Sequence, residues 1–258
     1  MAMGGRQGPK AKIRLYVAAA LKPGAVVPLR PDQAHYASKV MRLGPGARVL
    51  LFNGRDGEWR ARIESLGRKG GEAIAEVRTR AQGSEPDAAL LFAPLKKNAL
   101  DFVIEKATEL GIAVLQPVLT RRTAAERVNL ARLRAQAIEA AEQCERLTVP
   151  EVRPALALER ALSDWNGARR LYVADETGGG VPAAEAFSGA DPAGPVAFLV
   201  GPEGGFERSE LDALAPLLFV TRIALGPRIL RAETAALAAL ACWQALAGDG
   251  RSPPPPRD

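Results

Sequence analysis

The hydrophobic pattern of this chain changes at a short polar segment, residues 81–86, and this change most constrains the fold. The segment is Ala-Gln-Gly-Ser-Glu-Pro, a composition typical of a linker. Before it, short apolar runs alternate with turn residues. After it, apolar runs alternate with longer segments of helical period. A length of 258 residues allows roughly one to two domains. We therefore expect a first domain over residues 11–80 and a second over residues 87–248.

The first domain is predicted to be a small β-barrel. Asn53-Gly54 is a hairpin signal, and Gly44-Pro45-Gly46 marks another turn. One helix is expected from Pro31 to Met41, with proline at its first position. The predicted strands cover residues 13–17, 47–52, 58–65 and 73–78.

The second domain is predicted to be α/β with a mostly parallel sheet, because strands alternate with helices along the chain. The expected strands cover residues 88–93, 112–118, 170–174, 196–200 and 219–224. The expected helices cover residues 98–110, 129–146, 208–215 and 231–246.

Charge is distributed unevenly between these parts. Residues 1–80 hold 16 Lys and Arg against 6 Asp and Glu, a net charge of +10. Residues 81–258 hold 19 against 23, a net charge of −4. An arginine-rich proteome would explain the ratio of Arg to Lys, but not why the excess ends near residue 80. The asymmetry favours a polyanion such as RNA as the partner of the first domain.

The sequence argues against several classes of chemistry and against a membrane location. His35 is the one histidine, and the two cysteines, Cys144 and Cys242, lie far apart, so zinc sites, disulfide frameworks and histidine-dependent triads are disfavoured. The longest uncharged apolar stretch, residues 234–248, has 15 residues and is too short to span a bilayer. Residues 15–21 follow basic residues as in a signal peptide, but their alternation is typical of a strand. We expect a cytoplasmic protein.

A glycine-rich loop, Gly201-Pro202-Glu203-Gly204-Gly205-Phe206, lies between a predicted strand and a predicted helix. Ligands of open α/β sheets bind at the carboxyl ends of strands, so this position suits a site. Glu203 would repel a pyrophosphate, and the spacing differs from the dinucleotide motif. A ligand that is neutral or cationic near Glu203 is acceptable, and a tight turn with a solvated Glu203 is the alternative.

A second loop, residues 225–230, precedes a predicted helix that consists almost entirely of Ala and Leu. Arg231 and Glu233 lie at the start of this helix. A glutamate near a helix N-terminus is favoured by the helix dipole, whereas a cation there is opposed by it. The position of Arg231 is therefore better explained by an interaction with a negative charge, such as an anion, a carboxylate or a developing oxyanion. It is the strongest single catalytic candidate on physical grounds.

Taken together, these segments resemble the bacterial 16S ribosomal RNA uridine-N3 methyltransferases of the SPOUT class. In the first domain the resemblance rests on Arg14-Leu15-Tyr16, on His35 and Val40-Met41-Arg42, and on Gly44-Pro45-Gly46. In the second domain it rests on residues 106–111, on Glu142-Gln143 with Arg146 and Pro150, on residues 201–206 with Glu210, and on residues 225–235. One departure is Glu145, where the family pattern has a small residue before the arginine.

The resemblance implies a small PUA-like β-barrel followed by a SPOUT-type α/β domain with a deep C-terminal trefoil knot, active as a homodimer. Nothing in the sequence pattern itself reveals a knot, and knots are otherwise essentially absent from proteins. S-adenosylmethionine is expected as the cofactor, without a metal. The implied cofactor-binding residues are Glu176, Leu199, Gly201, Pro202, Gly204, Gly205, Leu225, Gly226, Ile229 and Leu230.

The implied reaction is methylation of N3 of a uridine in 16S ribosomal RNA within the small subunit. Arg231 would stabilise the negative charge that develops when N3 loses its proton, and Glu203 or Glu233 would accept that proton. The expected RNA-binding residues are Arg14, His35, Arg42, Arg121, Arg122, Gln143 and Arg146. A ribose 2′-O methyltransferase of the same class and a non-catalytic assembly factor that binds ribosomal RNA are the alternatives.

Overall fold

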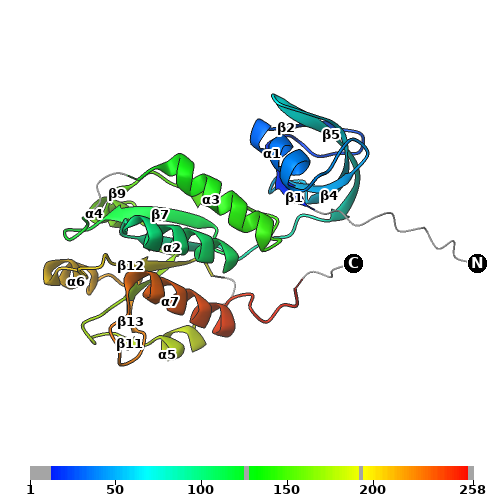
Figure 1. Cartoon of the computed structure of the whole chain (residues 1–258). Helices are drawn as coiled ribbons and strands as arrows, with labels where there is room; N and C mark the ends of the chain where they lie inside the picture. The colour runs from blue at the N-terminus through cyan, green and yellow to red at the C-terminus, as the bar shows by residue number, and fades with distance from the viewer. Residues whose placement is uncertain (1–12, 125–127, 192–193, 255–258) are drawn as a thin grey trace, which may run out of the picture. The chain divides into compact units, whose positions relative to one another are not determined.

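The computed structural model describes residues 13–124, 128–191 and 194–254, which form two compact units (Figure 1). The first unit contains the chain up to Ser84 together with a separate segment, Ala141–Thr148. The second unit contains Glu85–Ala140 and the chain from Val149 to Pro254. The two units are therefore not separated only at the linker, residues 81–86, because residues 141–148 also belong to the first unit.

The first unit is a five-stranded sheet in the order β1-β3-β4-β5-β2. Strands β1 and β3 are parallel, and the other neighbours are antiparallel. Alternate residues of these strands point into one core that includes Leu15, Val27, Leu51, Ile63 and Ala75, as their period of two requires. The strands are β1 (Arg14–Tyr16), β2 (Val26–Leu29), β3 (Arg48–Phe52), β4 (Glu58–Gly67) and β5 (Gly70–Arg80).

The helix expected over residues 31–41 has two parts. An α-helical turn, α1 (Pro31–His35), continues directly into a π-helix, η1 (Tyr36–Val40). Strand β2 was not expected, because Pro23-Gly24 and Pro28 make this stretch resemble a loop.

The second unit is built on an eight-stranded sheet whose strand pairs are all parallel. The strand order is β11-β13-β10-β12-β6-β7-β8, and β9 also pairs with β7. The strands are β6 (Ala88–Phe92), β7 (Val114–Leu119), β8 (Glu151–Val152), β9 (Leu156–Ala157), β10 (Arg170–Ala174), β11 (Val181–Pro182), β12 (Val196–Val200) and β13 (Val220–Ala224).

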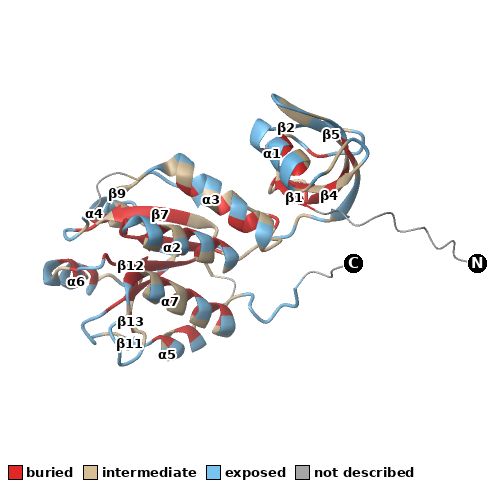
Figure 2. Cartoon of the chain, in the orientation of Figure 1, coloured by how far each residue is buried: buried red, intermediate tan, exposed pale blue. Residues whose placement is uncertain are grey.

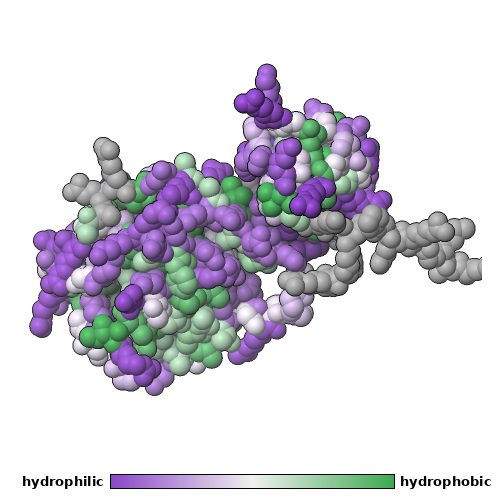
Figure 3. All heavy atoms as spheres, viewed as in Figure 1, coloured by the Kyte–Doolittle hydropathy of each residue, from purple (hydrophilic) through white to green (hydrophobic). Residues whose placement is uncertain are grey.

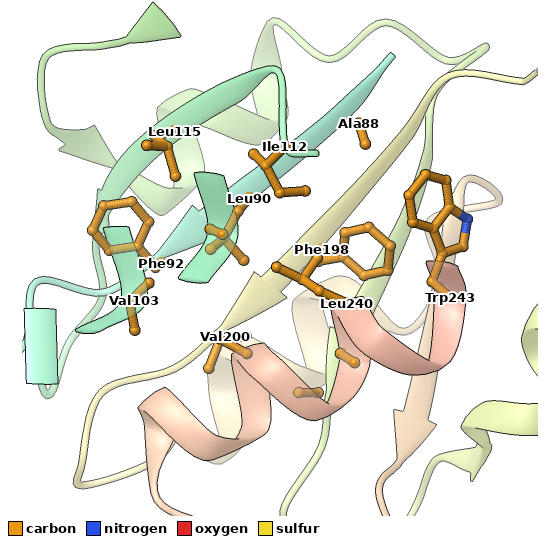
Figure 4. Packing of buried hydrophobic residues seen from close by; sticks show 14 of the residues in the cluster. Ala88, Leu90, Phe92, Val103, Ile112, Leu115, Phe198, Val200, Leu240 and Trp243 are labelled. Carbon is orange, nitrogen blue, oxygen red and sulfur yellow. The ribbon is translucent and has the colours of Figure 1, made fainter. Parts of the chain in front are cut away.

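Helices cover both faces of this sheet, so its central strands are apolar throughout, as β6 and β12 are (Figure 2). One face packs against α2, α3, α5 and α7 through a core around Leu90, Phe92, Phe198, Leu240 and Trp243 (Figure 4). The opposite face packs against α4 and α6. The helices are α2 (Lys97–Glu109), α3 (Leu130–Gln143), α4 (Leu158–Ser163), α5 (Ala183–Ser188), α6 (Arg208–Leu214) and α7 (Ala232–Leu246).

The C-terminal helix α7 is the most apolar helix of the second unit. It packs against α2, α5 and β12. The side of α7 that faces away from these elements also consists largely of alanine and leucine, and hydrophobic residues cover this area in the space-filling view (Figure 3). Within the described residues, no helix combines the length and the hydrophobicity needed to cross a membrane.

Candidate active site

The candidate site lies at the edge of the second sheet where the parallel strands end. Strands β13, β10, β12, β6 and β7 are consecutive neighbours, so the loops that follow them emerge at the same edge. Four of these loops carry residues that the sequence singled out. They are residues 120–123 after β7, residues 175–180 after β10, residues 201–207 after β12 and residues 225–231 after β13.

The glycine-rich loop after β12 is held by Glu176 from the loop after β10. The backbone N–H of Phe206 donates a hydrogen bond to Oε1 of Glu176 at 2.9 Å. Gly205 has a φ of +69°, and a Cβ at this position would collide with the Glu176 carboxylate. A Cβ at Gly201 would lie 3.0 Å from the buried Phe206 ring. The positive φ favours glycine at 205, Gly201 packs tightly against the Phe206 ring, and the hydrogen bond to Glu176 fixes the loop.

The loop after β10 is in turn anchored to β13 by a buried ion pair. The Asp175 side chain is fully buried, and its Oδ2 accepts a hydrogen bond from Nε of Arg222 at 2.8 Å. Its Oδ1 accepts hydrogen bonds from the backbone N–H and the hydroxyl of Thr177. Burial alone would raise the pKa of Asp175, but the hydrogen bonds from Thr177 and Arg222 hold it below its usual value.

Glu203 points back across the sheet edge toward the end of β6. Its Oε1 accepts a hydrogen bond from the backbone N–H of Lys96 at 3.3 Å, and the residue is exposed. The negative charge of a glutamate in this loop disfavours a pyrophosphate but tolerates a ligand with a positive charge.

The two arginines after β7 lie beside the glycine-rich loop. Nη1 of Arg122 donates to the backbone carbonyl of Gly204 at 2.9 Å. The backbone N–H of Arg121 donates to the buried Glu210, which also caps the first turn of α6. Both arginines are exposed. The structure therefore brings the sequence-predicted Arg121 and Arg122 to the same edge as Glu176 and Glu203.

Arg231 occupies the position that precedes the first helical residue of α7. It has an extended backbone (φ −65°, ψ 155°), its side chain is exposed, and no described residue accepts a hydrogen bond or forms an ion pair with it. Glu233 lies in the first turn of α7 and is half-buried. The preceding loop contains Gly226, at a φ of +100°, and Ile229, which is 87% exposed. The loop and the start of α7 thus present two exposed cations, Arg228 and Arg231, and one large apolar side chain without partners in the described structure.

Leu199 is expected to contact the cofactor, and this contact stays a prediction. Its side chain is fully buried in the core on the α4 and α6 face of the sheet, beside Leu91 and Val173. In this structure Leu199 packs the sheet and does not reach the loops.

Arg14, expected to bind RNA, is buried in the first unit. Its Nε forms an ion pair with Glu58 at 2.7 Å, and both side chains are 6% exposed. Its Nη1 and Nη2 donate to the backbone carbonyls of Ala141 and Arg146, and its guanidinium lies 3.6 Å from the centre of the Phe52 ring. A guanidinium held in this way is not available to a phosphate, so the expectation for Arg14 is corrected to a structural role.

The other expected RNA-binding residues of the first unit lie in two places. His35 and Arg42 are exposed at the start and the end of the η1 region. Gln143 is exposed in the segment 141–148, where Arg146 donates to the hydroxyl of Thr148. Glu145 has a φ of +63°, which explains why a small residue is expected there, and Nη1 of Arg80 donates to its carbonyl at 2.7 Å.

Sequence reasoning missed the Asp175–Arg222 pair, the contact of Lys96 with Glu203 and the attachment of residues 141–148 to the first unit. Arg222 lies 47 residues from Asp175, and the partners of Arg14 in the segment 141–148 lie more than 100 residues from it, so no local pattern indicates such pairings.

Comparison with known proteins identifies the family. Residues 83–244 match the model of the RNA methyltransferase domain, and residues 29–76 match that of the RNA methyltransferase PUA domain. The ribosomal RNA small subunit methyltransferase E of Rickettsia conorii is 34% identical over 88% of this chain and 93% of its own length. Its namesake from Synechocystis is 31% identical over 90% of this chain and 77% of its own length.

Solved structures agree. The ribosomal RNA small subunit methyltransferase E of Neisseria gonorrhoeae, crystallised with S-adenosyl methionine, superposes with a TM-score of 0.81 at 29% identity, over 92% of this chain and 98% of that one. A putative methyltransferase from Legionella pneumophila, solved with the same cofactor, gives 0.80 at 28% identity with the same coverage. The expected SPOUT-type α/β domain with an N-terminal PUA-like domain is confirmed, while the knot remains a prediction. The chain belongs to the family of ribosomal RNA small subunit methyltransferases E.

Proposed function

We propose that this protein transfers a methyl group from S-adenosylmethionine to N3 of a uridine in 16S ribosomal RNA of the small subunit. The observation that carries the proposal is the pairing of two features at one sheet edge. A rigid glycine-rich loop containing Glu203 lies after β12, and an unpartnered Arg231 precedes α7. The first feature suits a cationic cofactor, and the second suits a substrate that becomes an anion.

The residues of this edge fit S-adenosylmethionine. Gly204 is exposed and has no side chain that would block a ligand, and the hydrogen bond from Phe206 to Glu176 keeps the loop conformation fixed. Glu203 supplies negative charge, which a sulfonium accepts and a pyrophosphate does not. Backbone and side chains from residues 201–205 and 225–230, with Glu176, would hold the cofactor, which supplies an electrophilic methyl group when bound.

The chemistry then requires a cation and a base from the protein. N3 of uridine is mostly protonated at neutral pH, and loss of its proton places negative charge on O2 and O4. Arg231 has no competing partner in the described structure, so its guanidinium is free to stabilise this charge, as donors do in an oxyanion hole. Glu233, two residues further on, or Glu203 accepts the proton. Holding N3 in line with the methyl group supplies much of the remaining rate.

RNA contacts are proposed on both units. Arg121 and Arg122 flank the glycine-rich loop, and His35, Arg42 and Gln143 are exposed in the first unit. Arg146 completes the set, and Arg14 is left out because it is buried. Contacts of this kind with phosphates position the RNA without specifying its sequence.

We further propose that the enzyme works as a homodimer in the cytoplasm. Ile229 is 87% exposed in the loop that leads into α7, the outer surface of this helix is rich in alanine, and Val181 of the same unit is 47% exposed. Apolar surface of this kind marks sites of association.

Nucleoside analysis of 16S ribosomal RNA tests the proposal in cells. Deleting the gene should remove N3-methyluridine from the small subunit. The wild-type gene should restore it, and a gene carrying Arg231→Ala should not. Loss of a ribose 2′-O-methyl nucleoside instead would support the other enzyme of the same class. An assembly defect with every methylated nucleoside still present would support the assembly factor.

A further inference from the structure

The π-helix η1 of the first unit is a second feature that suits RNA. The inference drawn from it rests on the proposed RNA substrate. The backbone N–H of Met41 donates to the carbonyl of Tyr36, five residues back, at 3.0 Å. The N–H of Leu43 donates to the carbonyl of Ala37 at 2.8 Å. Short π-helical segments are rare and are found frequently at functional sites.

Arg42 follows this segment in a conformation that disfavours arginine. Its φ is +54°, in the left-handed region, which costs a residue with a Cβ about 1–2 kcal/mol. Glycine would take this conformation without strain. The chain's other residue of this kind in the described structure, Glu145, has its carbonyl bound by Arg80, whereas the Arg42 side chain has no protein partner there. A cation retained here against the backbone preference suggests a role outside the fold.

One side of the α1–η1 segment is buried in the first unit, and the opposite side exposes an aromatic and an aliphatic side chain. Gln33, Ala34 and Ala37 are buried, and Nε2 of Gln33 donates to the carbonyl of Tyr16 at 2.8 Å. The outward side carries Tyr36, 39% exposed, and Val40, 59% exposed. These two residues are four apart, so on a helical segment they lie near the same side.

The cations around Tyr36 are not neutralised by the protein. Neither Lys39 nor Arg42 forms an ion pair with any described residue. Nearby Arg30 differs, because Asp32 lies 2.9 Å from its guanidinium. An exposed aromatic ring on the same short segment as two cations without a described partner matches the chemistry of proteins that bind single-stranded nucleic acid. There the bases stack on aromatic rings and the phosphates meet Lys and Arg. Bases in a duplex are already stacked and offer no free face.

We propose that Tyr36 stacks on an unpaired base of the RNA substrate while Lys39 and Arg42 bind the phosphates beside that base. Tyr36 is then a positioning residue for the methylation, and this face of the first unit selects single-stranded RNA over duplex.

Stacking and charge have separate signatures in binding measurements. The probes are small subunits from cells that lack the gene, and a short uridine-rich RNA, single-stranded or annealed to its complement. Tyr36→Ala should weaken binding of the subunit and of the single strand roughly fivefold to hundredfold, because one stacked base contributes about 1–3 kcal/mol. The salt dependence of binding should not change. Tyr36→Phe should bind like the wild type, because the ring is retained.

Removing the cations should act on the salt dependence instead. Lys39→Gln with Arg42→Gln should lower the slope of log affinity against log salt by about 1.4, since each phosphate contact with single strands contributes about 0.7. The matched control is Lys22→Gln with Arg30→Gln, which removes the same charge from the same unit at exposed positions and should change the slope less. In all variants the affinity for S-adenosylmethionine and the melting temperature report that the fold is intact.

These outcomes separate this inference from the proposed function. If the wild type methylates the subunit and Tyr36→Ala binds the single strand as tightly as the wild type, the stacking role is wrong while the proposed function stands. If the cation variant and its control change the slope equally, Lys39 and Arg42 make no specific contact. If single strand and duplex bind alike, selection of unpaired RNA is wrong. Absence of methyl transfer by the wild type would instead reject the proposed function.

Discussion

At the scale of single residues, the most informative side chains are those whose placement opposes a simple physical preference. Arg231 is a cation at the positive end of a helix, and no described residue pairs with it. The unfavourable position of Arg231 relative to the helix dipole could be inferred from the sequence, because this inference needs only the residue at which the helix begins. The burial of Arg14 was not available, because its partners belong to distant parts of the chain.

Replacing Arg231 separates catalysis from binding. Arg231→Ala should lower kcat by about 10²–10³, the usual loss when one donor to a developing oxyanion is removed. The dissociation constant of S-adenosylmethionine, measured by calorimetry, should change less than about twofold, because the proposed partner of this guanidinium is the uridine anion and not the cofactor. Equal losses in kcat and in cofactor affinity would make Arg231 a cofactor-binding or folding residue.

Two neighbouring glycines of the loop after β12 provide a matched test of its rigidity. Gly205→Ala should weaken cofactor binding at least tenfold, because the new Cβ would collide with Glu176 and φ is +69°. Gly204→Ala is the control, because its Cβ would meet Arg122 only at 3.6 Å, an ordinary contact. Titration of both variants with S-adenosylmethionine measures the two dissociation constants to be compared. Similar affinities would mean that the loop rearranges freely and that the Glu176 contact does not fix it.

At the scale of elements, the sequence pattern predicted the long and fully buried segments well. The strands expected at residues 170–174 and 196–200 match β10 and β12, because runs of four and five apolar residues between turn signals leave little choice. The helix expected at 231–246 differs from α7 by one residue. Short elements were missed, among them α4 and α5, because six residues do not establish a helical period.

The ion pair between β10 and β13 predicts how stability depends on pH. The pKa of Asp175 is lowered from its ordinary value of 3.8, so the folded state binds the proton less well than the unfolded state. Its contribution is therefore complete above about pH 4 and is lost as the pH falls through the lower folded pKa. Unfolding of the wild type and of Asp175→Asn should be compared between neutral pH and pH 3. The stability difference should shrink as the pH falls, and a difference that stays constant would contradict this account.

Arg14 is predicted to stabilise the first unit by joining β1 and β4 to the end of α3. Arg14→Ala should destabilise the protein by about 3 kcal/mol, because buried Glu58 loses its close ion-pair partner and keeps only Arg80, at 3.8 Å, and the hydroxyl of Thr79. Arg14→Met with Glu58→Gln should recover part of this loss, because no buried charge remains unpaired. Denaturant unfolding measures both. If Arg14→Ala is as stable as the wild type but binds the subunit less tightly, then Arg14 contacts RNA as the sequence suggested.

At the scale of the whole molecule, the sequence predicted a small β domain followed by an α/β domain, and the family models of a PUA domain and an RNA methyltransferase domain match in that order. The place of residues 141–148 was beyond local reasoning. These residues continue a helix of the second unit, but their partners in the first unit, Arg14, Tyr16 and Arg80, are set by tertiary contacts. The knot is likewise a property of the complete chain path, and no periodicity or spacing encodes it.

The central claim is the site of methylation, and one transfer experiment tests it most directly. The protein is mixed with S-adenosylmethionine that carries a labelled methyl group and with small ribosomal subunits from cells that lack this gene. The 16S RNA is then digested to nucleosides. We predict that the label is recovered as N3-methyluridine and that Arg231→Ala greatly reduces it. Label on a ribose 2′-oxygen, or label in transfer RNA and none in the subunit, would contradict the claim.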